Sequence, residues 1–241
     1  MRRSSHESPQ RGGGEGREGA RVLVSPRRDG AGANRPLAAQ RQDVADAVPD
    51  LVRRAQRGEI AAFNTLVIRH QNAAYSLAFR FLRSREAAED VTQESFVRAW
   101  RAIETFRGER FRSWLLRIVA NAARDELRRR KRRPQRSLDE ARDDPDMASI
   151  DPAEPGLGPQ ERVEQSELRA VLERALAELP EEWRMAVLLS DVHGMSYEEV
   201  SEATGVPLGT VKSRLSRARA RLRDLLSESG ELSGLVQRRN T

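Results

Sequence analysis

The stretch PEEWRMAVLLSDVHGMSYEEVSEATGVPLGTVKSRLSRARARLRDLL, residues 180–226, decides the fold. Within it, Ser196 precedes Glu199 by three positions, the capping-box pattern of a helix N-terminus. Gly205 is expected to end this helix, because glycine tolerates the left-handed conformation of a tight turn. Pro207 fits the first turn of a second helix, where its missing N–H would be unpaired anyway. The stretch therefore predicts a helix-turn-helix.

The second helix of this motif carries one apolar stripe and one kind of charge. Its apolar residues recur at steps of four and three, which place them on one helical face: Val211, Leu215, Ala218, Leu222 and Leu225. The other faces are basic, with no acid between Pro207 and Arg223: Lys212, Arg214, Arg217, Arg219, Arg221 and Arg223. Because solvated helices usually alternate charge sign, this face is expected to bind an outside anion, and duplex DNA suits it best.

The composition of the whole chain also favours a polyanionic partner. In 241 residues, 43 Lys and Arg outweigh 37 Asp and Glu, for a formal net charge of +6. Cysteine is absent and the three histidines have no metal-ligand spacing, so we expect no metal site. No cofactor and no catalytic residue are expected either. No apolar run follows the N-terminal arginines or could span a membrane, so the chain is expected in the cytoplasm without membrane insertion.

Shifts in composition divide the chain into two small helical domains and three other segments, which predicts an all-α fold. In chain order these are a disordered basic tail (1–44), a first helical domain (45–136), a flexible acidic linker (137–165), a second domain with the helix-turn-helix (166–228) and a frayed tail (229–241). The tail before residue 45 and the linker contain too little apolar material to offset their ordering entropy. The linker also holds nine acids and four prolines.

The first domain is predicted to begin with two helices, at residues 50–57 and 59–83. A third helix follows, and it has distinct inward and outward faces. The inward stripe is Ala88, Val91, Ser95, Ala99 and Ile103. This stripe leaves a second set pointing away from the core: Asp90, Gln93, Glu94 and Val97. An outward face of this kind is available to a partner.

A loop predicted at residues 106–109 precedes a basic helix. Its inward residues are Phe111, Leu115, Ile118, Ala122 and Leu127, and arginines occupy much of the remaining surface. Phe106, Phe111 and Trp114 stand among those arginines, and aromatic rings beside arginines are typical of surfaces that stack unpaired bases. The period alone favours a core position for Phe111 and Trp114, so both interpretations stay open.

Three motifs in this order resemble bacterial RNA polymerase sigma factors, specifically the extracytoplasmic-function (ECF) subgroup of the sigma-70 family. DVTQESFVRAW at residues 90–100 looks like the family's segment that binds core polymerase. FRGERFRSWLLRIVANAARDELRRR at residues 106–130 looks like the segment that melts and reads the minus-ten element. GTVKSRLSRARARL at residues 209–222 is similar to the minus-thirty-five recognition helix. The resemblance covers residues 50–133 and 168–226.

The resemblance implies a role for each matching residue. Core polymerase, through the clamp helices of its largest subunit, would dock on Asp90, Gln93, Glu94 and Val97. The minus-ten strand would contact Phe106, Arg107, Gly108, Glu109, Arg110, Asn121 and Arg124, with Asn121 lining a pocket for a flipped base. The minus-thirty-five duplex would contact Thr210, Lys212, Ser213, Arg214, Ser216 and Arg217.

As a whole, the resemblance implies a factor that brings core polymerase to promoter DNA, both duplex and melted, without making bonds itself. It further implies an anti-sigma factor as partner and a regulon for stress or envelope responses. Two alternatives were weighed against it. An autonomous helix-turn-helix regulator would need a dimerisation surface, and no long apolar seam is present. A DNA-processing enzyme would need the carboxylates of Asp143, Asp144 and Asp146 on rigid elements, but they lie in the linker.

Overall fold

The computed structural model describes residues 48–108, 110–132 and 158–228, and within these ranges every regular element is a helix. The prediction of an all-α fold is thereby confirmed. The predicted basic tail, the residues of the acidic linker before 158, the tail from 229 onward and Glu109 lie outside the described residues. Asp143, Asp144 and Asp146 lie outside them as well.

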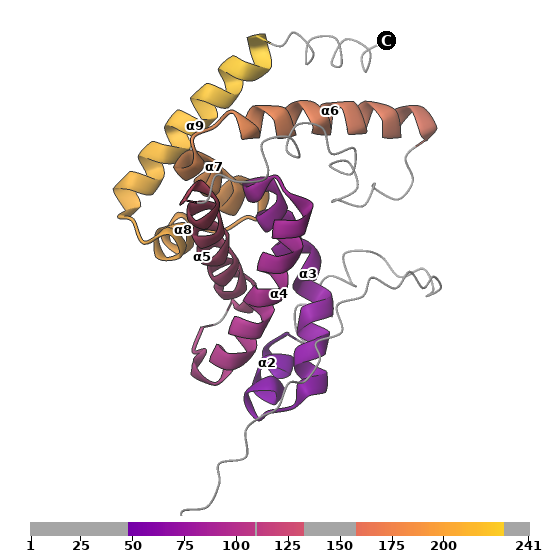
Figure 1. Cartoon of the computed structure of the whole chain (residues 1–241), viewed down its shortest axis with the longest axis vertical. Coiled ribbons are helices and arrows are strands. Elements are labelled where there is room, and N and C mark those ends of the chain that lie inside the picture. The colour runs from indigo at the N-terminus through magenta and orange to yellow at the C-terminus, as the bar shows by residue number, and fades with distance from the viewer. Residues whose placement is uncertain (1–47, 109, 133–157, 229–241) are drawn as a thin grey trace, which may run out of the picture. The chain divides into compact units, whose positions relative to one another are not determined.

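The first domain comprises α2 (Val48–Gln56), α3 (Ile60–Leu82), α4 (Arg85–Ala102), the 3₁₀ turn η1 (Ile103–Thr105) and α5 (Phe111–Arg132) (Figure 1). The helices predicted at 50–57 and 59–83 correspond to α2 and α3 with ends shifted by one or two residues. All five residues of the predicted inward stripe of α4 and η1 are buried.

The core of this domain is built from large apolar side chains of α3, α4 and α5. Phe63 and Leu66 of α3, Phe96 of α4 and Phe111 and Leu115 of α5 are at most 2% exposed. Burying one such side chain stabilises a fold by roughly 1.5–3 kcal/mol relative to leaving it in water. The α3–α4–α5 packing therefore supplies the rigid base from which the loop before α5 projects.

The second domain comprises α6 (Pro159–Ala177), α7 (Glu181–Val187), the π-helical turn η3 (Leu188–Val192), α8 (Tyr197–Thr204) and α9 (Leu208–Glu228). Its last two helices form the predicted helix-turn-helix. Both hydrogen bonds of the capping box are present, from Glu199 N to Ser196 Oγ at 3.2 Å and from Ser196 N to Glu199 Oε2 at 2.8 Å. Gly205 ends α8 with a φ of 71°, the left-handed conformation expected of it.

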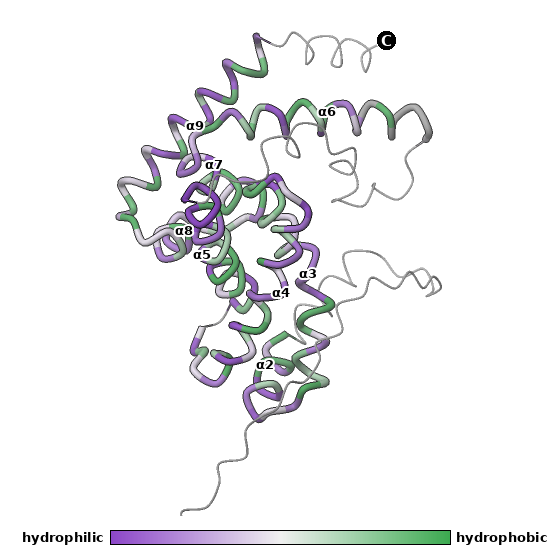
Figure 2. Tube along the Cα trace, viewed as in Figure 1, coloured by the Kyte–Doolittle hydropathy of each residue, from purple (hydrophilic) through white to green (hydrophobic). Residues whose placement is uncertain are grey.

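The apolar stripe of α9 packs inward, as its spacing predicts. Val211, Leu215 and Ala218 are buried, while Leu222 and Leu225, nearer the end of the helix, are half-buried. Figure 2 shows hydrophobic and hydrophilic residues alternating around α9, as expected of an amphipathic helix. The basic side chains are thereby left on the outward faces of the helix.

One predicted boundary is wrong. The linker was expected to extend to residue 165, but α6 begins at Pro159, so residues 159–165 are helical. Proline is favoured in the first turn of a helix, because its missing N–H would be unpaired there anyway. This local signal outweighs the polar composition that favoured a linker.

At one end of the contact between the two domains, α3 contributes the side chain of Arg80 and the main-chain carbonyl of Phe81. Arg80 Nε lies 2.6 Å from Glu173 Oε1 of α6, and both side chains are only 9% exposed. Arg184 of α7 donates to the Phe81 carbonyl at 3.2 Å. Burial lowers the pKa of Arg184, and the charge of Arg83 lowers it further. Even so, an arginine remains protonated at neutral pH.

His70, a half-buried histidine of the first domain, should make folding sensitive to mild acid. Burial against Phe111 and the nearby charges of Arg112 and Arg69 lower the pKa of His70 to about 4, and its Nε2 is buried without a partner in the described structure. Between pH 6.5 and 4 the unfolded chain binds a proton here that the folded chain does not, so stability falls as the pH falls.

The free energy of unfolding of the wild-type protein should fall when the pH is lowered from 7 to 4.5. We expect this fall to be about 2–3 kcal/mol larger than in the variant His70→Gln, because one pKa unit corresponds to about 1.4 kcal/mol. Urea unfolding at both pH values measures the difference. Carboxylates titrate in the same range in both proteins, so only the difference between them reports on His70. Parallel losses in the two proteins would contradict the assignment.

Candidate nucleic-acid interface

The outward face of α4 is fully available in the described structure. Its four predicted docking residues, Asp90, Gln93, Glu94 and Val97, are all exposed, and Val97 is 38% exposed although it is apolar. Glu94 Oε1 accepts a hydrogen bond from Arg98 Nη2 at 2.7 Å on the same face. An apolar residue between charged ones fits a surface that becomes covered by another protein.

The loop before α5 is organised by the aromatic ring of Phe106. This ring is only 7% exposed, and its centroid lies 4.9 Å from that of Trp114 and 6.1 Å from that of Phe111. The Phe106 carbonyl accepts a hydrogen bond from Gln56 Nε2 of α2 at 2.9 Å. Phe106 is therefore an anchor for the loop, whereas Arg107 and Gly108 beside it are exposed.

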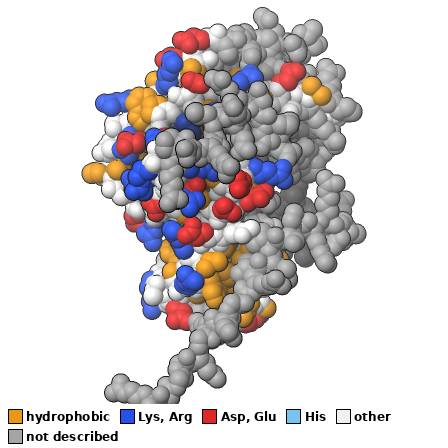
Figure 3. All heavy atoms as spheres, viewed as in Figure 1, with side chains coloured by type: hydrophobic (Ala, Val, Ile, Leu, Met, Phe, Trp, Pro, Cys, Tyr) orange, Lys and Arg blue, Asp and Glu red, His pale blue; other side chains and the backbone are white. Residues whose placement is uncertain are grey.

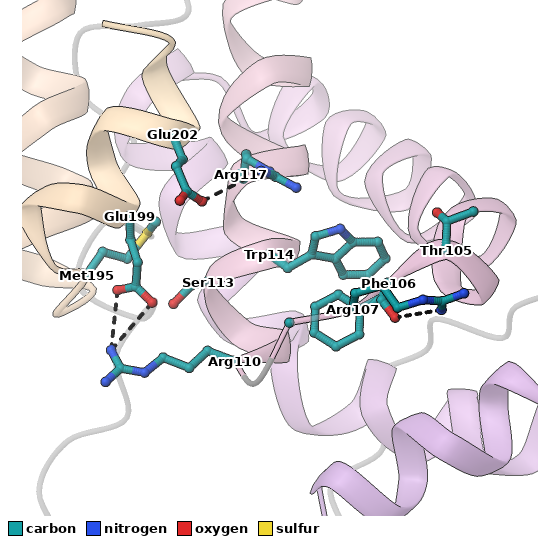
Figure 4. A pocket seen from close by; sticks show the side chains of 11 residues that line it. Thr105, Phe106, Arg107, Arg110, Ser113, Trp114, Arg117, Met195, Glu199 and Glu202 are labelled. Atoms are coloured by element: carbon teal, nitrogen blue, oxygen red, sulfur yellow. Dashed lines mark hydrogen bonds and ion pairs between the residues drawn. The ribbon is translucent and has the colours of Figure 1, made fainter. Parts of the chain in front are cut away.

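A cavity of about 470 Å³ opens beside this loop, and residues of both domains line it (Figure 4). Its lining is Thr105, Phe106, Arg107, Gly108, Arg110, Ser113, Trp114 and Arg117 on one side and Met195, Glu199 and Glu202 on the other. Trp114 is half-buried and contributes to the wall, while Phe111 is 1% exposed and belongs to the core. Trp114 thus fits the interpretation as a surface aromatic residue, and Phe111 fits the interpretation as a core residue.

Asn121 does not line this cavity. It is exposed on α5, and its Oδ1 accepts a hydrogen bond from Arg124 Nη2. Of the predicted minus-ten residues, Phe106, Arg107, Gly108 and Arg110 are thus brought together around one cavity. Asn121 and Arg124 form a separate pair further along α5.

Four arginines, which we call the arginine row, contact the second domain: Arg110, Arg112, Arg117 and Arg124. Arg110 Nη1 lies 3.4 Å from Glu199 Oε1, and Arg117 Nη1 lies 3.9 Å from Glu202 Oε2. Figure 4 shows these two arginines extending toward the two carboxylates of α8. Arg112 donates to the carbonyl of His193, and Arg124 donates to the carbonyls at the end of α8.

The recognition helix α9 keeps its predicted DNA-binding face exposed. Lys212, Ser213, Ser216 and Arg217 are exposed, whereas Thr210 and Arg214 are half-buried. In the part of the chain that the structure describes, neither Lys212 nor Arg217 has a carboxylate partner. These two cations are available to an external anion, as the one-signed sequence of this helix predicts.

Two other arginines of α9 are paired within the domain, which the sequence of the helix alone could not show. Arg214, whose side chain is 19% exposed, binds Glu182 of α7. Arg219 binds Asp191 of η3 at 2.7 Å and Tyr197 Oη at 3.2 Å, and the hydrogen bond with Asp191 is the main cause that raises the pKa of Arg219. The face of the molecule drawn in Figure 3 likewise shows charges of both signs interspersed.

The described residues offer neither a metal site nor a membrane span. No group of His, Cys, Asp and Glu side chains in residues 48–108, 110–132 and 158–228 is arranged to hold a metal ion. Over the same residues, none of the helices combines the length and the apolar character that crossing a lipid bilayer requires.

Comparison with family models matches both domains separately. Residues 66–133 match the model of sigma-70 region 2, and residues 169–222 match that of sigma-70 region 4. The first match contains α4, the loop and α5, and the second contains the helix-turn-helix. The two matches therefore coincide with the three surfaces described above.

Individual relatives agree with the family models. The chain is 40% identical over 170 residues to the ECF RNA polymerase sigma-E factor of Salmonella typhimurium, covering 70% of this chain and 88% of that protein. It is 38% identical over 171 residues to the RNA polymerase sigma-H factor of Pseudomonas aeruginosa, with the same coverage.

Two solved structures of similar fold contain a bound partner. One is CnrH in complex with the cytosolic domain of CnrY, at a TM-score of 0.54 and 30% identity, covering 76% of this chain and 98% of that one. The other is the sigma factor RpoE in complex with the anti-sigma factor NepR from Bartonella quintana, at a TM-score of 0.54 and 29% identity, covering 68% and 96%.

The loop should depend on the absence of a side chain at Gly108. A Cβ added there would lie 3.0 Å from Phe106 Cε2 and 3.3 Å from its Cζ, so the aromatic ring would have to shift from its position in the cavity wall. Since stacking on aromatic residues contributes roughly 1–3 kcal/mol per base, we expect Gly108→Ala to weaken binding of a single-stranded oligonucleotide about fivefold in a fluorescence-anisotropy titration. Gly209→Ala, where an added Cβ meets no atom within 4 Å, is the control. Equal affinities for the two variants would show that the ring position does not matter.

Proposed function

Since the chain belongs to the sigma-70 family, in its ECF subgroup, and directs transcription initiation with RNA polymerase, we propose which of its surfaces performs each step. One observation supports this assignment above all. The region 2 match contains an exposed α4 face and an aromatic loop, and the region 4 match contains an exposed basic recognition helix. The family consists of initiation factors, and we propose that this chain likewise catalyses no reaction itself.

The outward face of α4 docks on core polymerase in this proposal. Asp90, Gln93, Glu94 and Val97 would contact the clamp helices of the largest polymerase subunit. Their exposure, and the apolar side chain of Val97 among charged neighbours, support this role.

The helix-turn-helix reads the minus-thirty-five element as duplex DNA. Lys212 and Arg217 lack intramolecular carboxylate partners in the described residues, so phosphates or guanine edges can satisfy them. Arg214 is held by Glu182, which limits the directions in which its guanidinium can point. Thr210, Ser213 and Ser216 lie on the same helix and add hydroxyl groups toward the groove.

The loop and α5 bind the melted minus-ten strand. Phe106 and Trp114 supply aromatic walls for an unstacked base, and Arg107 and Arg110 supply positive charge at the rim of the cavity. Gly108 allows Phe106 its position, while Glu109, Asn121 and Arg124 complete the set implied by the family motif. The two domains thus bind different forms of the same promoter.

The cellular context follows from the same family membership. We propose that the chain acts in the cytoplasm, where RNA polymerase works, on genes of a stress or envelope response. The similar structures of CnrH and RpoE were solved with bound partners, in RpoE an anti-sigma factor. An anti-sigma factor is accordingly the regulatory partner that we propose for this chain.

Run-off transcription with purified core polymerase tests the proposed function. We expect specific transcripts from a library of genomic promoter fragments only when the chain is added. Arg214→Ala and Arg217→Ala should each weaken binding to the promoter duplex by about 1–3 kcal/mol, the usual contribution of an arginine that reads a base.

Arg53→Ala is the matched control for these substitutions. It removes the same charge from an exposed side chain of α2, outside the proposed DNA surfaces. Sequence-specific duplex binding without any transcript would point instead to an autonomous helix-turn-helix regulator. Unchanged duplex affinity in both α9 variants would refute the recognition-helix assignment.

The α4 face should be required for polymerase binding alone. We expect Gln93→Ala combined with Glu94→Ala to lower the affinity for core polymerase by about tenfold, because a docking surface concentrates its binding free energy in a few residues. Surface plasmon resonance with the full chain measures this affinity, and a promoter duplex measures DNA binding by the same protein. Glu86→Ala, also exposed on α4, serves as the control. Full core affinity in the double variant would exclude this face.

A further inference from the structure

The last residue of α2 reaches the loop before α5 through its side-chain amide. Gln56 Nε2 donates to the Ile103 carbonyl at 3.2 Å and to the Phe106 carbonyl at 2.9 Å. An amide nitrogen carries two hydrogens, so both of its donors are engaged by the loop. The opposite orientation of the amide would place its oxygen against two carbonyl oxygens, so only this orientation makes both hydrogen bonds. Gln56 thus connects α2 with a turn that lies 47 to 50 residues further along the chain.

The position of Gln56 is fixed by the packing of α2, which contacts α3, η1 and α5. Three apolar residues of this helix are buried: Leu51, Val52 and Ala55. The turn after the helix is closed by Arg54, whose Nε donates to Glu59 Oε2 at 2.8 Å. Gly58 in the same turn has a φ of 89°, which glycine adopts readily. The half-buried amide of Gln56 therefore stands on a firm support from which it can hold a loop in place.

The loop needs hydrogen-bond donors because α4 and η1 end here, and the last carbonyls of a helix have no partner within it. Two donors are local. Thr105 Oγ1 donates to the Ala102 carbonyl at 2.9 Å, and Arg107 Nη1 donates to the Glu104 carbonyl at 2.8 Å. These bonds shape the turn without attaching it to another element. Among the side chains that donate to these carbonyls in the described residues, only that of Gln56 comes from another helix.

One of the two carbonyls that Gln56 holds belongs to the residue whose ring lines the cavity. The Phe106 ring contacts Trp114 at a tilt of 47° and meets Phe111 edge-on at 86°. Gly108 lies so close that an added Cβ would be 3.0 Å from the ring. Figure 4 shows the rings of Phe106 and Trp114 side by side at the cavity. Because ring and carbonyl belong to one residue, holding the carbonyl fixes the place from which the ring enters the wall.

We propose that Gln56 is a positioning residue for base capture: its amide holds the loop so that Phe106 lies beside Trp114, ready for an unstacked base of the minus-ten strand. This inference rests on the proposed function. Gln56 lies outside residues 66–133, which match the region 2 model, so the family match assigns it no role. A loop that is already ordered loses less conformational entropy when the strand binds, which raises the affinity for the base. Gln56 acts through Phe106 and does not contact the base itself.

Strand binding by the holoenzyme, assembled from core polymerase and the full chain, tests this role. The minus-ten strand of a promoter found by run-off transcription is compared with the same strand carrying an abasic site at one position. The position at which base removal most weakens wild-type binding identifies the captured base. Gln56→Leu keeps the bulk of the side chain and removes both donors. We expect it to weaken binding of the intact strand about fivefold, the lower end of what two lost hydrogen bonds correspond to, and to change binding of the abasic strand by less than about twofold.

Three further variants separate positioning from a general effect on the domain, with the ratio of intact-strand to abasic-strand affinity as readout. Gln71→Leu makes the same replacement at another half-buried glutamine, which has no hydrogen bond to the loop in the described structure, and should keep the wild-type ratio. Gln56→Lys should keep most of the ratio, because an ammonium group carries three donors and its added charge favours both strands alike. Gln56→Glu has only acceptors when ionised and should lose the ratio as Gln56→Leu does.

The outcomes distinguish this inference from the proposed function. Equal weakening of both strands by Gln56→Leu, an unchanged ratio in that variant, or a ratio as low in Gln56→Lys would overturn the positioning role while the proposed function still stood. If the wild-type holoenzyme bound intact and abasic strands equally at every position, the proposed minus-ten surface would fail, and this inference with it. Thermal melting and binding to the minus-thirty-five duplex check that each variant is folded. Gln56→Ala, which adds no apolar bulk, replaces Gln56→Leu if the latter melts early.

Discussion

The constraint behind much of this structure is that each arginine in a chain so rich in arginine needs an anion or a carbonyl oxygen. A guanidinium group cannot shed its proton in a protein and presents five donors in a fixed plane. On α5, this requirement is met by both ends of α8, through Glu199 at the first turn and the Ala203 and Thr204 carbonyls at the last. The two domains are therefore joined by groups that nucleic acid could also satisfy.

The recognition helix meets the same requirement differently. Glu182 of α7 and Asp191 of η3 bind Arg214 and Arg219, and these pairs tie α9 to the helices beneath it. Arg217 and Lys212 have no such carboxylate within the described residues. The pair with Glu182 thus holds Arg214 in place on the proposed DNA-binding face, whereas Lys212 and Arg217 are available to DNA phosphates and bases, whose contacts set affinity and specificity.

Local patterns predicted the elements well, whereas contacts between distant residues were out of reach. The capping box of Ser196 and Glu199, the turn at Gly205 and the inward stripe of α4 depend on neighbours within a few positions, and all were confirmed. The start of α6 differs from the prediction because a proline that opens a helix is a stronger local signal than the polar composition around it. Arg124 binds main-chain carbonyls some 80 residues away, and a carbonyl carries no residue-specific signal in a sequence. The site roles inferred from the family motifs remain predictions.

The two ends of the contact between the domains differ in burial, and this difference indicates where separation begins. Each of the two ion pairs of the arginine row has one largely exposed side chain, Arg110 at 71% and Glu202 at 72%. Water and salt therefore weaken these pairs, and an exposed pair contributes only about 0–1 kcal/mol. Arg80 and Glu173, at the α3–α6 end, are 9% exposed, and separating them would leave two desolvated charges without partners. The end over the cavity is thus the weaker one. When the two domains separate, we therefore expect the polar contacts over the cavity to break before the buried α3–α6 pair.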